Sequence, residues 1–386
     1  MEKDNNNAKR LTDRDVTAHT ASLWKYNPVP ESPEPYPEWA VKSEKSGDLS
    51  AAAASVRGKK HKHEGTNCDD GFAFEFFDGT AIAAVSDGAG SKIFSRIGAR
   101  AACNAAIKYV KARLGAIKRD TPDYREILGR PLDSAEFGGM CSQIAGMLRD
   151  SYAEAFAAVE AAFEKRKAYP EFEQAAGRKP ELKDFSCTLL AAVIIPVETA
   201  GGREYLTATI QLGDGMIAGL DEKAENPLII LGTADSGSFA GETEFITSEQ
   251  FRSSESLMSR TKIRRGKLTS LMLMTDGVAD DYYPNNPQLL RLALDLKLNG
   301  IMEIGEGEVP EDITVPEPVS YPWVNDSDVM YALQYAKNVL DETGMTLEQL
   351  WSNAGVQKKA SLAEFGIVHE KDSAEMLKIW LDNYVE

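Results

Sequence analysis

The chain has 386 residues, of which 43% are hydrophobic and 27% charged, and its formal net charge is −17. This length and composition allow one large domain with insertions, or two domains, with a core over most of the chain. So acidic a chain is not expected to bind nucleic acid or an anionic membrane as its main partner. No apolar run is long enough to cross a membrane, and the polar N-terminus is unlike a signal peptide. The four cysteines are widely spaced, so we expect reduced thiols and a cytoplasmic location.

The N-terminal part, residues 1–50, is polar and rich in proline, which predicts an arm that is flexible or lies extended on the domain. Regular structure is expected to begin near Ala52, within one domain that spans residues 51–386. Two strand-like runs flank Asp78-Gly79, a strong turn signal, and predict a hairpin over residues 70–87. Apolar residues at helical spacing then predict a helix after Ser91 and a longer helix within residues 137–166.

The pattern changes to strands between residues 185 and 231, with runs at 187–195, 205–212, 216–220 and 228–231. Residues 233–267 are rich in Gly and Ser and are expected to be irregular, ending in a solvated basic loop at 264–267. A strand is expected at 271–274, a mostly helical insertion at about 284–370, and a final helix at 372–384. Strands, then two long helices, then more strands favour an α+β fold over alternating βαβ units.

Three apolar runs end on the same two residues, at Asp87-Gly88, Asp214-Gly215 and Asp276-Gly277. An acidic pair, Asp69-Asp70, stands just before a fourth strand-like run. Because a sheet places strand ends side by side along one edge, these carboxylates are expected to converge. Clustered carboxylates repel one another unless a cation neutralises them, and oxygen ligands suit hard divalent ions such as Mg2+ or Mn2+. The pattern therefore predicts a metal-dependent enzyme.

With their surroundings, these motifs resemble the metal-dependent serine/threonine protein phosphatases of the PPM type, also called type 2C, and most of all a bacterial branch of that family. They occur in the family's order over roughly residues 52–283. The matching segments are Gly65–Phe72, Val85–Ser91, Ser186–Leu190, Leu212–Gly215 and Met274–Asp280. The resemblance implies a four-layer α-β-β-α sandwich, in which two antiparallel sheets are flanked by helices, with two Mn2+ or Mg2+ ions at one end.

The resemblance also implies an activity and the residues that carry it. Asp87 would bridge both ions, Gly88 would offer its carbonyl oxygen to one of them, and Asp276 would bind one ion. Asp70 would act through the water shell of the second ion, which makes Asp70, Asp87 and Asp276 the catalytic carboxylates. The implied reaction is hydrolysis of phosphoserine and phosphothreonine in proteins by a metal-activated water, on substrates supplied by a cognate kinase.

Two further acidic residues belong to the metal site by the same resemblance. Asp69 would lie beside Asp70, and Asp214 would help to hold a weaker third ion. Residues 236–243 resemble a flexible segment near the site in the bacterial branch and are a candidate lid.

The chain departs from the family where the substrate phosphate would bind. Family members often carry an arginine just before the first acidic pair, whereas this chain has the basic segment 59–64 there, with Arg57 upstream. Arg57, Lys62 or His63 would then hold the phosphate, and a solvated basic turn is the alternative reading of this segment.

A second departure concerns the general acid. Eukaryotic relatives often have a histidine after the Asp-Gly pair, where this chain has Ala89. That leaves His61, His63 or a metal-bound water for the role, since histidine titrates in the right range.

A third departure concerns the family's last metal-binding motif, an acidic pair that opens a final strand, which is not found before Glu386. Asp326 and Asp328 look instead like a helix cap. Either the chain continues beyond Glu386 or the site lacks one carboxylate. The second case motivates an alternative function, a catalytically impaired phosphatase-like module for binding or regulation. A hydrolase of small phosphoesters is a further alternative.

Overall fold

The computed structural model describes residues 25–224, 226–233, 244–248, 254–282, 285–298, 301–302 and 372–384. One layer of the described fold is a five-stranded antiparallel sheet in the order β3-β4-β5-β6-β9. Its strands are β3 Gly71–Phe77, β4 Thr80–Ser86, β5 Leu189–Thr199, β6 Gly202–Leu212 and β9 Thr261–Gly266. The central strand β5 is buried over almost its whole length, as expected of a strand covered on both faces.

The hairpin predicted from Asp78-Gly79 is confirmed as β3 and β4. Both turn residues have positive φ angles, 50° at Asp78 and 68° at Gly79, which suits a tight two-residue turn between twisted strands. The strands pair from Phe77 opposite Thr80 to Gly71 opposite Ser86. This register leaves Asp70 and Asp87 beside each other at the end of the sheet.

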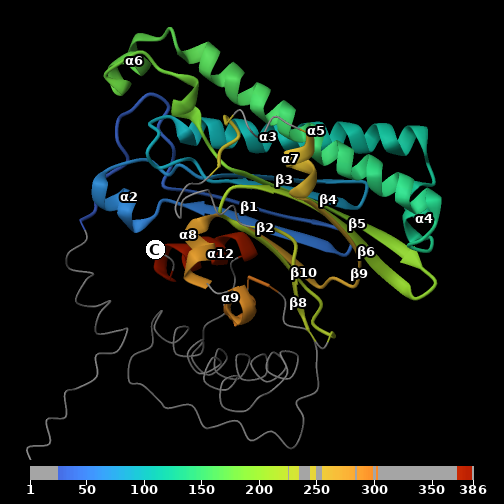
Figure 1. Ribbon diagram of the computed structural model, residues 1–386. Helices are drawn as coiled ribbons and strands as arrows, with labels where there is room; N and C mark the ends of the chain where they lie inside the picture. Colours follow the sequence, from blue (N-terminus) through green and yellow to red (C-terminus); the bar gives the residue numbers. More distant parts are fainter. Residues whose placement is uncertain are drawn as a thin grey trace, which may run out of the picture.

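Two long helices, α3 Ser95–Asp120 and α5 Ala135–Arg166, cover one face of this sheet (Figure 1). Both helices confirm the sequence prediction. Ser134 caps α5, because its side-chain oxygen accepts a hydrogen bond from the Phe137 N–H at 3.2 Å. Buried side chains of both helices and of β5 and β6 form the main hydrophobic core. Shorter elements at this side are α4 Tyr124–Gly129, α6 Pro170–Ala176 and the 3-10 helix η1 Leu182–Phe185.

The second layer consists of two smaller antiparallel sheets (Figure 1). One is the hairpin of β1 Trp39–Ser46 and β2 Leu49–Val56, and the other has the order β10-β7-β8. The strands of the latter are β7 Met216–Leu220, β8 Leu228–Ile230 and β10 Ser270–Met274. Helices α9 Asn285–Leu298 and α12 Ser373–Tyr384 cover this layer, and their side chains form a second core with β7 and β10. The fold is thus the predicted α+β sandwich, with antiparallel sheets between helices.

Several segments that we expected to be irregular have regular structure. Among the described residues, which start at Lys25, the first regular element is β1, so the predicted arm already contains regular structure before Ala52. The segment 59–64 is the helix α2 Lys59–Glu64, and residues 254–266 contain α7 Ser254–Ser259 and β9. β1 and β9 have few apolar residues because both are edge strands, which use charged residues to discourage further pairing.

The predicted solvated loop at 264–267 is corrected most clearly by Arg265 in β9. Its guanidinium donates to the Glu204 carboxylate at 3.1 Å and to the Leu128 carbonyl oxygen at 2.8 Å. It therefore joins β9 to the neighbouring strand β6 and to α4. The predicted strands at 187–231 and the final helix are confirmed as β5 to β8 and α12.

Parts of the sequence prediction lie outside the described residues. These are residues 1–24 of the predicted arm, the candidate lid at 236–243, Asp326, Asp328 and most of the insertion at 284–370, of which the structure describes α9. Among the helices that the structure describes, none has both the length and the apolar character needed to cross a membrane.

Candidate metal centre

Strand pairing brings the ends of β3, β4 and β5 into one row. Asp70 precedes β3 and Asp87 follows β4, and they are neighbours because Gly71 is paired with Ser86. Thr188, just before β5, stands next in the row. Its hydroxyl accepts a hydrogen bond from the Asp87 N–H at 2.8 Å, and its own N–H donates to the Asp87 carbonyl oxygen at 2.8 Å. The backbone of Asp87 is therefore fixed to the five-stranded sheet.

The same row continues into the turn that connects the two layers. β6 ends at Leu212, and the residues that follow it carry Asp214 across to β7. Gln211 shapes this turn, because its Nε2 donates to the carbonyl oxygens of Gly213 at 3.2 Å and Gly215 at 2.6 Å. Met216 is paired with Met274, so Asp276, two residues after Met274, comes close to Asp214.

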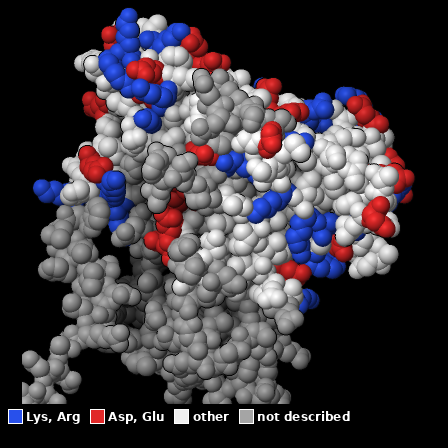
Figure 2. Space-filling view, in the orientation of Figure 1, with Lys and Arg blue, Asp and Glu red and all other residues white. Residues whose placement is uncertain are grey.

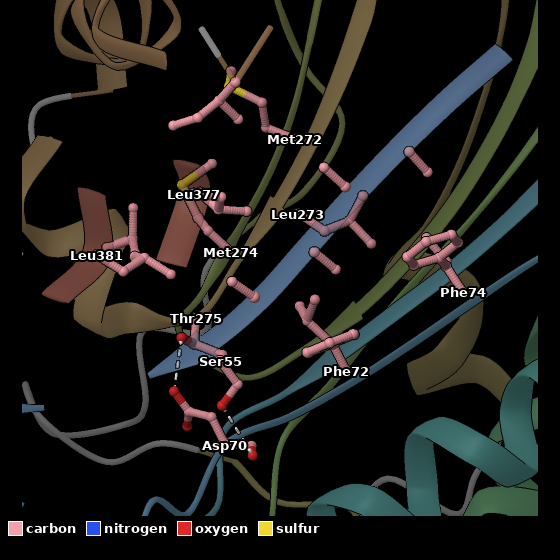
Figure 3. A pocket seen from close by; sticks show the side chains of 18 of the residues that line it. Ser55, Asp70, Phe72, Phe74, Met272, Leu273, Met274, Thr275, Leu377 and Leu381 are labelled. Atoms are coloured by element: carbon pink, nitrogen blue, oxygen red, sulfur yellow. Dashed lines mark hydrogen bonds between the residues drawn. The ribbon is translucent and has the colours of Figure 1, made fainter. Parts of the chain in front are cut away.

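Four carboxylates meet at this point. The carboxylate oxygens of Asp87, Asp214 and Asp276 lie within 4.8 Å of one another. Asp70 joins them, since its Oδ2 accepts a hydrogen bond from Thr275 Oγ1 at 3.2 Å (Figure 3) and its carboxyl group interacts directly with that of Asp87. The convergence predicted from the Asp-Gly motifs is therefore present, with ligands drawn from both layers.

The electrostatics of the cluster favour a cation. Burial, followed by the charges of Asp70 and Asp276, raises the pKa of Asp87 to about 10. Burial, followed by the charges of Asp214 and Asp70, raises the pKa of Asp276 to about 6. Burial also raises the pKa of Asp70, while hydrogen bonds from Asp87 and Thr275 oppose that shift. Divalent cations would stabilise the ionised forms, so this donor set fits Mg2+ or Mn2+.

Close backbone approach explains two of the three glycines that follow these aspartates. A Cβ at Gly88 would lie 2.5 Å from the Asp69 carbonyl oxygen and 3.0 Å from the Ser95 carbonyl carbon. A Cβ at Gly215 would lie 2.3 Å from the Met274 carbonyl oxygen. Gly277, in contrast, has no heavy atom within 4 Å of that position. Glycine is therefore required where the aspartate loops cross other backbone segments, and space alone does not require it after Asp276.

The backbone of Gly88 takes part in the cluster. It lies opposite Cys187 in an isolated bridge, in which the hydrogen bonds run from Ala89 to Ser186 and from Thr188 to Asp87. In such a pair the N–H and C=O of Gly88 itself point to the other side. Its N–H there donates to the Asp70 carboxylate, so its carbonyl oxygen also lies on the side of Asp70. This placement agrees with the role that the resemblance implies for Gly88.

Asp69 points differently from Asp70. Its carboxylate accepts a hydrogen bond from Ser95 at the start of α3 and interacts with the charge of Arg96. Burial raises the pKa of Asp69 to about 7, and the Arg96 charge partly opposes that shift. Asp69 thus borders the cluster through Asp70, and its role as a metal ligand stays a prediction.

Arg57 is corrected as a candidate for the substrate phosphate. Its side chain is fully buried and donates hydrogen bonds to the carbonyl oxygens of Asn27, His61 and Thr66 at 2.7–2.9 Å and to Glu38 Oε1 at 2.9 Å. A guanidinium with these partners fastens the segment before β1 to α2 and has no exposed edge for a phosphate.

The other basic candidates lie on α2. Lys62 Nζ pairs with Asp382 of α12 at 2.5 Å, and His63 Nδ1 accepts a hydrogen bond from the Lys25 N–H at 3.0 Å. His61 comes nearest to the cluster: its Nδ1 lies 2.6 Å from Thr66 Oγ1, and the Asp70 charge acts on its ring. Burial is the larger effect and lowers the pKa of His61. A phosphate role for Lys62 or His63, and a general-acid role for either histidine, stay predictions.

Sequence reasoning missed the three side chains that position the carboxylates, Thr188, Gln211 and Thr275. Thr275 had a local signal, because it stands directly before Asp276 and its hydroxyl reaches Asp70. Thr188 lies in the segment Ser186–Leu190 that resembles the family, but its contact with Asp87 depends on which strands become neighbours. Gln211 had no signal, since its role depends on the same pairing.

The fold and the site together define a class: an α+β sandwich protein with a cluster of carboxylate ligands between its two sheet layers. Residues 57–297 match the model of the family described as Protein phosphatase 2C, which is more than half of the chain. The chain therefore belongs to the protein phosphatase 2C family.

Solved structures give weaker likenesses. A bacterial serine phosphatase is 10% identical, with a TM-score of 0.34, and the match covers 66% of this chain and 83% of that one. A point variant of a bacterial serine phosphatase is 12% identical, with a TM-score of 0.31 and coverages of 66% and 84%. RsbX in complex with magnesium is 12% identical, with a TM-score of 0.22 and coverages of 62% and 74%. Likenesses this loose carry no argument about function. Among curated proteins, none matches this chain.

Proposed function

We propose that this protein hydrolyses phosphoserine or phosphothreonine in protein substrates, with two Mn2+ or Mg2+ ions held by Asp70, Asp87 and Asp276 and a weaker third ion near Asp214. Membership of the phosphatase 2C family supports the reaction class. The observation that carries the proposal is the approach of the Asp87, Asp214 and Asp276 oxygens to within 4.8 Å of one another. Three partly buried carboxylates this close together repel one another unless cations or protons neutralise them.

Ions bound there would neutralise the carboxylates, activate a water by lowering its pKa from about 15.7 towards 7, and offset the charge of the phosphoryl oxygens. The protein's own contribution is to fix the ligands. Asp87 is held by Thr188 and lies between Asp70 and Asp276, which suits a bridging carboxylate. Asp70 is oriented by Thr275 and by the Gly88 N–H.

The charge of the surface makes local cations important for substrate binding. The chain has a net charge of −17, which opposes the approach of a phosphorylated peptide. On the face shown in Figure 2, small groups of Lys and Arg alternate with groups of Asp and Glu among the described residues. We infer that the attraction for a phosphate comes from the cations of the centre, helped by Lys62 or His63.

The proposal extends to the setting of the protein. We take it to act in the cytoplasm, opposite a kinase that phosphorylates the same substrates. The insertion at 284–370 and the segment before β1 are the regions that we propose for selecting those substrates, since the metal centre itself contacts only the phosphate.

The test is Mn2+-dependent release of phosphate from a phosphothreonine peptide and from p-nitrophenyl phosphate. The variants are Asp87→Asn and, as a matched control, Asp133→Asn at an exposed position. We expect peptide hydrolysis to fall by at least about 1,000-fold in Asp87→Asn, because the ligand between the ions loses its charge, and to be unchanged in Asp133→Asn. Turnover of p-nitrophenyl phosphate alone would indicate a small-phosphoester hydrolase. Binding of Mn2+ with no turnover of either substrate would indicate the binding or regulatory module.

A further inference from the structure

His61 of α2 lies at the end of the sandwich where the candidate metal centre is located. Figure 1 shows α2 at the same end as α8 Asp276–Ala279, which begins with a predicted metal ligand. His61 lines the same cavity as Asp70 and Asp276. Of the two histidines among the described residues, His63 does not line this cavity. The structure therefore distinguishes two histidines that the sequence left equivalent.

The backbone and the ring of His61 are both held in place. Its carbonyl oxygen accepts hydrogen bonds from the buried Arg57 side chain at 2.9 Å and from the N–H groups of Gly65 and Thr66 at 2.9 and 3.0 Å. Nδ1 of the ring lies 2.6 Å from Thr66 Oγ1. Because Nδ1 is engaged by Thr66, Nε2 is the ring nitrogen that remains for a ligand.

The ring interacts with the carboxylate cluster through its charge. Among the charges that act on His61, that of Asp70 has the largest effect, larger than that of Glu64 on the same short helix. The influence is mutual, because the charge of His61 opposes the raised pKa of Asp70. Together with the shared cavity, this interaction places the ring beside the carboxylates.

The ring is expected to be neutral at pH 7 and above. Burial is the largest effect and lowers the pKa of His61 below its usual value of 6.5. The charges of Lys60 and Arg57 add to this shift, whereas those of Asp70 and Glu64 oppose it. Cations bound by the aspartates would lower the pKa further, because like charges repel. A neutral imidazole carries one N–H, on either of its two ring nitrogens.

The surroundings of the ring favour the form with the proton on Nε2. In that form the Thr66 hydroxyl donates to Nδ1, and the N–H stands on the side of the ring away from Thr66, where a negative group attracts it. We propose that His61 binds the phosphoryl group of the substrate by donating a hydrogen bond from Nε2 to a phosphoryl oxygen, with Thr66 as the residue that positions the ring. This inference rests on the proposed phosphatase function and supplies a phosphate contact that the buried Arg57 cannot make.

A phosphate donor and a general acid would affect two substrates differently. A general acid protonates the leaving oxygen, which matters for the threonine alkoxide and little for p-nitrophenolate, a stable anion. A donor to the phosphoryl group helps both substrates. We therefore expect His61→Asn to lower kcat/KM by at least about tenfold on both the phosphothreonine peptide and p-nitrophenyl phosphate.

The closing experiment needs no turnover: it is a titration of the Mg2+-loaded full chain with inorganic phosphate, followed by 15N NMR of the histidine rings. Mg2+ is used because Mn2+ would broaden the signals. We expect phosphate to shift the Nε2 signal of His61, which is identified by its absence in the variants. His61→Asn lacks a polar atom at the Nε2 position and should weaken phosphate binding by at least about tenfold. The matched variant His61→Gln places its amide near that position and should weaken binding by less than about threefold.

A second pair of variants tests the positioning by Thr66. Thr66 is exposed, and valine has nearly its size, so Thr66→Val should fold normally. We expect the fraction of His61 with its proton on Nε2 to fall in Thr66→Val and phosphate binding to weaken by roughly threefold. Thr66→Ser keeps the hydroxyl and should restore both.

Four results would overturn the proposal. The first two are that phosphate does not bind the loaded wild-type chain, or binds His61→Asn equally well. The third is a loss of activity in His61→Asn that is confined to the phosphothreonine peptide, which would make His61 a general acid. The fourth is loss of Mg2+ binding in His61→Asn, which would make it a metal ligand. If phosphate binding depends on His61 but neither substrate is hydrolysed, the phosphate contact stands and the proposed activity fails.

Discussion

The two sheet layers of this protein differ in how completely they are built. The five-stranded layer is continuous from β3 to β9, and its strand β5 is buried along nearly its whole length. The opposite layer is divided into β1–β2 and β10–β7–β8, with a groove between them. In the described part of the chain, the sandwich thus contains one continuous, closed layer and one divided layer, and the candidate metal centre lies where they meet.

The ligands are divided between the layers as well. Asp70 and Asp87 are fixed by the hairpin β3–β4 and by Thr188 of the closed layer. Asp276 follows β10 at the edge of the groove, and Asp214 lies in the turn that joins the layers. The closed layer therefore supplies a rigid half of the centre. The other half depends on where β10 lies.

The largest effect on the metal centre is expected from Gly88→Ala, which changes the half of the centre that the five-stranded layer fixes. The added Cβ would lie 2.5 Å from the Asp69 carbonyl oxygen, and a backbone atom cannot move away as a side chain can. We expect Mn2+ binding and phosphatase activity to be lost, with a fall in the unfolding free energy of about 1–3 kcal/mol. Gly277→Ala has open space and should keep both properties. If both variants bind Mn2+ equally well, the close approach of the Gly88 and Asp69 backbones is not needed for metal binding.

A second effect, on stability alone, should separate the two layers. Leu189 of β5 is fully buried in the main core, so Leu189→Ala is expected to cost about 2–5 kcal/mol. Leu273 of β10 is half-buried beside the groove, and Leu273→Ala should cost only about 1 kcal/mol because less apolar surface returns to water. Urea unfolding of both variants gives the comparison. Similar losses would mean that the second layer is packed as tightly as the first.

A third effect is a dependence of stability on pH in the metal-free protein. Burial raises the folded-state pKa of Asp87 from 3.8 to about 10 and that of Asp276 from 3.8 to about 6. Above pH 4 the unfolded chain releases these protons while the folded protein keeps them, so the unfolding free energy falls as pH rises. The contribution of Asp276 is lost by about pH 6 and that of Asp87 by about pH 10.

Urea unfolding in EDTA at about pH 5 and pH 8 measures this slope. We expect lower stability at the higher pH, a weaker slope in Asp87→Asn, and a weaker slope again when Mn2+ replaces EDTA, because cations then take the place of protons. If the unfolding free energy depends on pH equally in the wild type and in Asp87→Asn, then Asp87 does not cause this dependence.

The parts of the fold that could be predicted are those with a local cause. Asp78-Gly79 fixes a hairpin by its own backbone preferences, and the apolar runs that end at Asp87 and Asp276 mark the strands β4 and β10. The strands β1 and β9 were not predicted, because their charged residues suit an exposed edge of a sheet. Which strand forms an edge is defined only once the other strands are in place.

The candidate site also has parts with a local sequence cause and parts that depend on the fold. Repeated Asp-Gly pairs indicate carboxylates at strand ends, and the structure brings them together. The misassignment of Arg57 has a physical reason: an arginine near an acidic pair reads as a phosphate ligand, yet its hydrogen bonds go to carbonyl oxygens of loops that are distant along the chain. No sequence pattern indicates such a network. The hydrogen bonds by which Thr188 and Gln211 hold the aspartate loops depend in the same way on which strands pair.

The stoichiometry of Mn2+ binding, measured by isothermal titration calorimetry at a pH where the metal-free cluster still holds protons, tests most directly whether the aspartates form one metal centre. We expect two Mn2+ ions per chain, with release of protons on binding, and loss of at least one of these ions in Asp87→Asn. A wild-type chain that binds no Mn2+, or an Asp87→Asn chain that binds it as the wild type does, would contradict the claim that carboxylates of the two sheet layers form one metal centre.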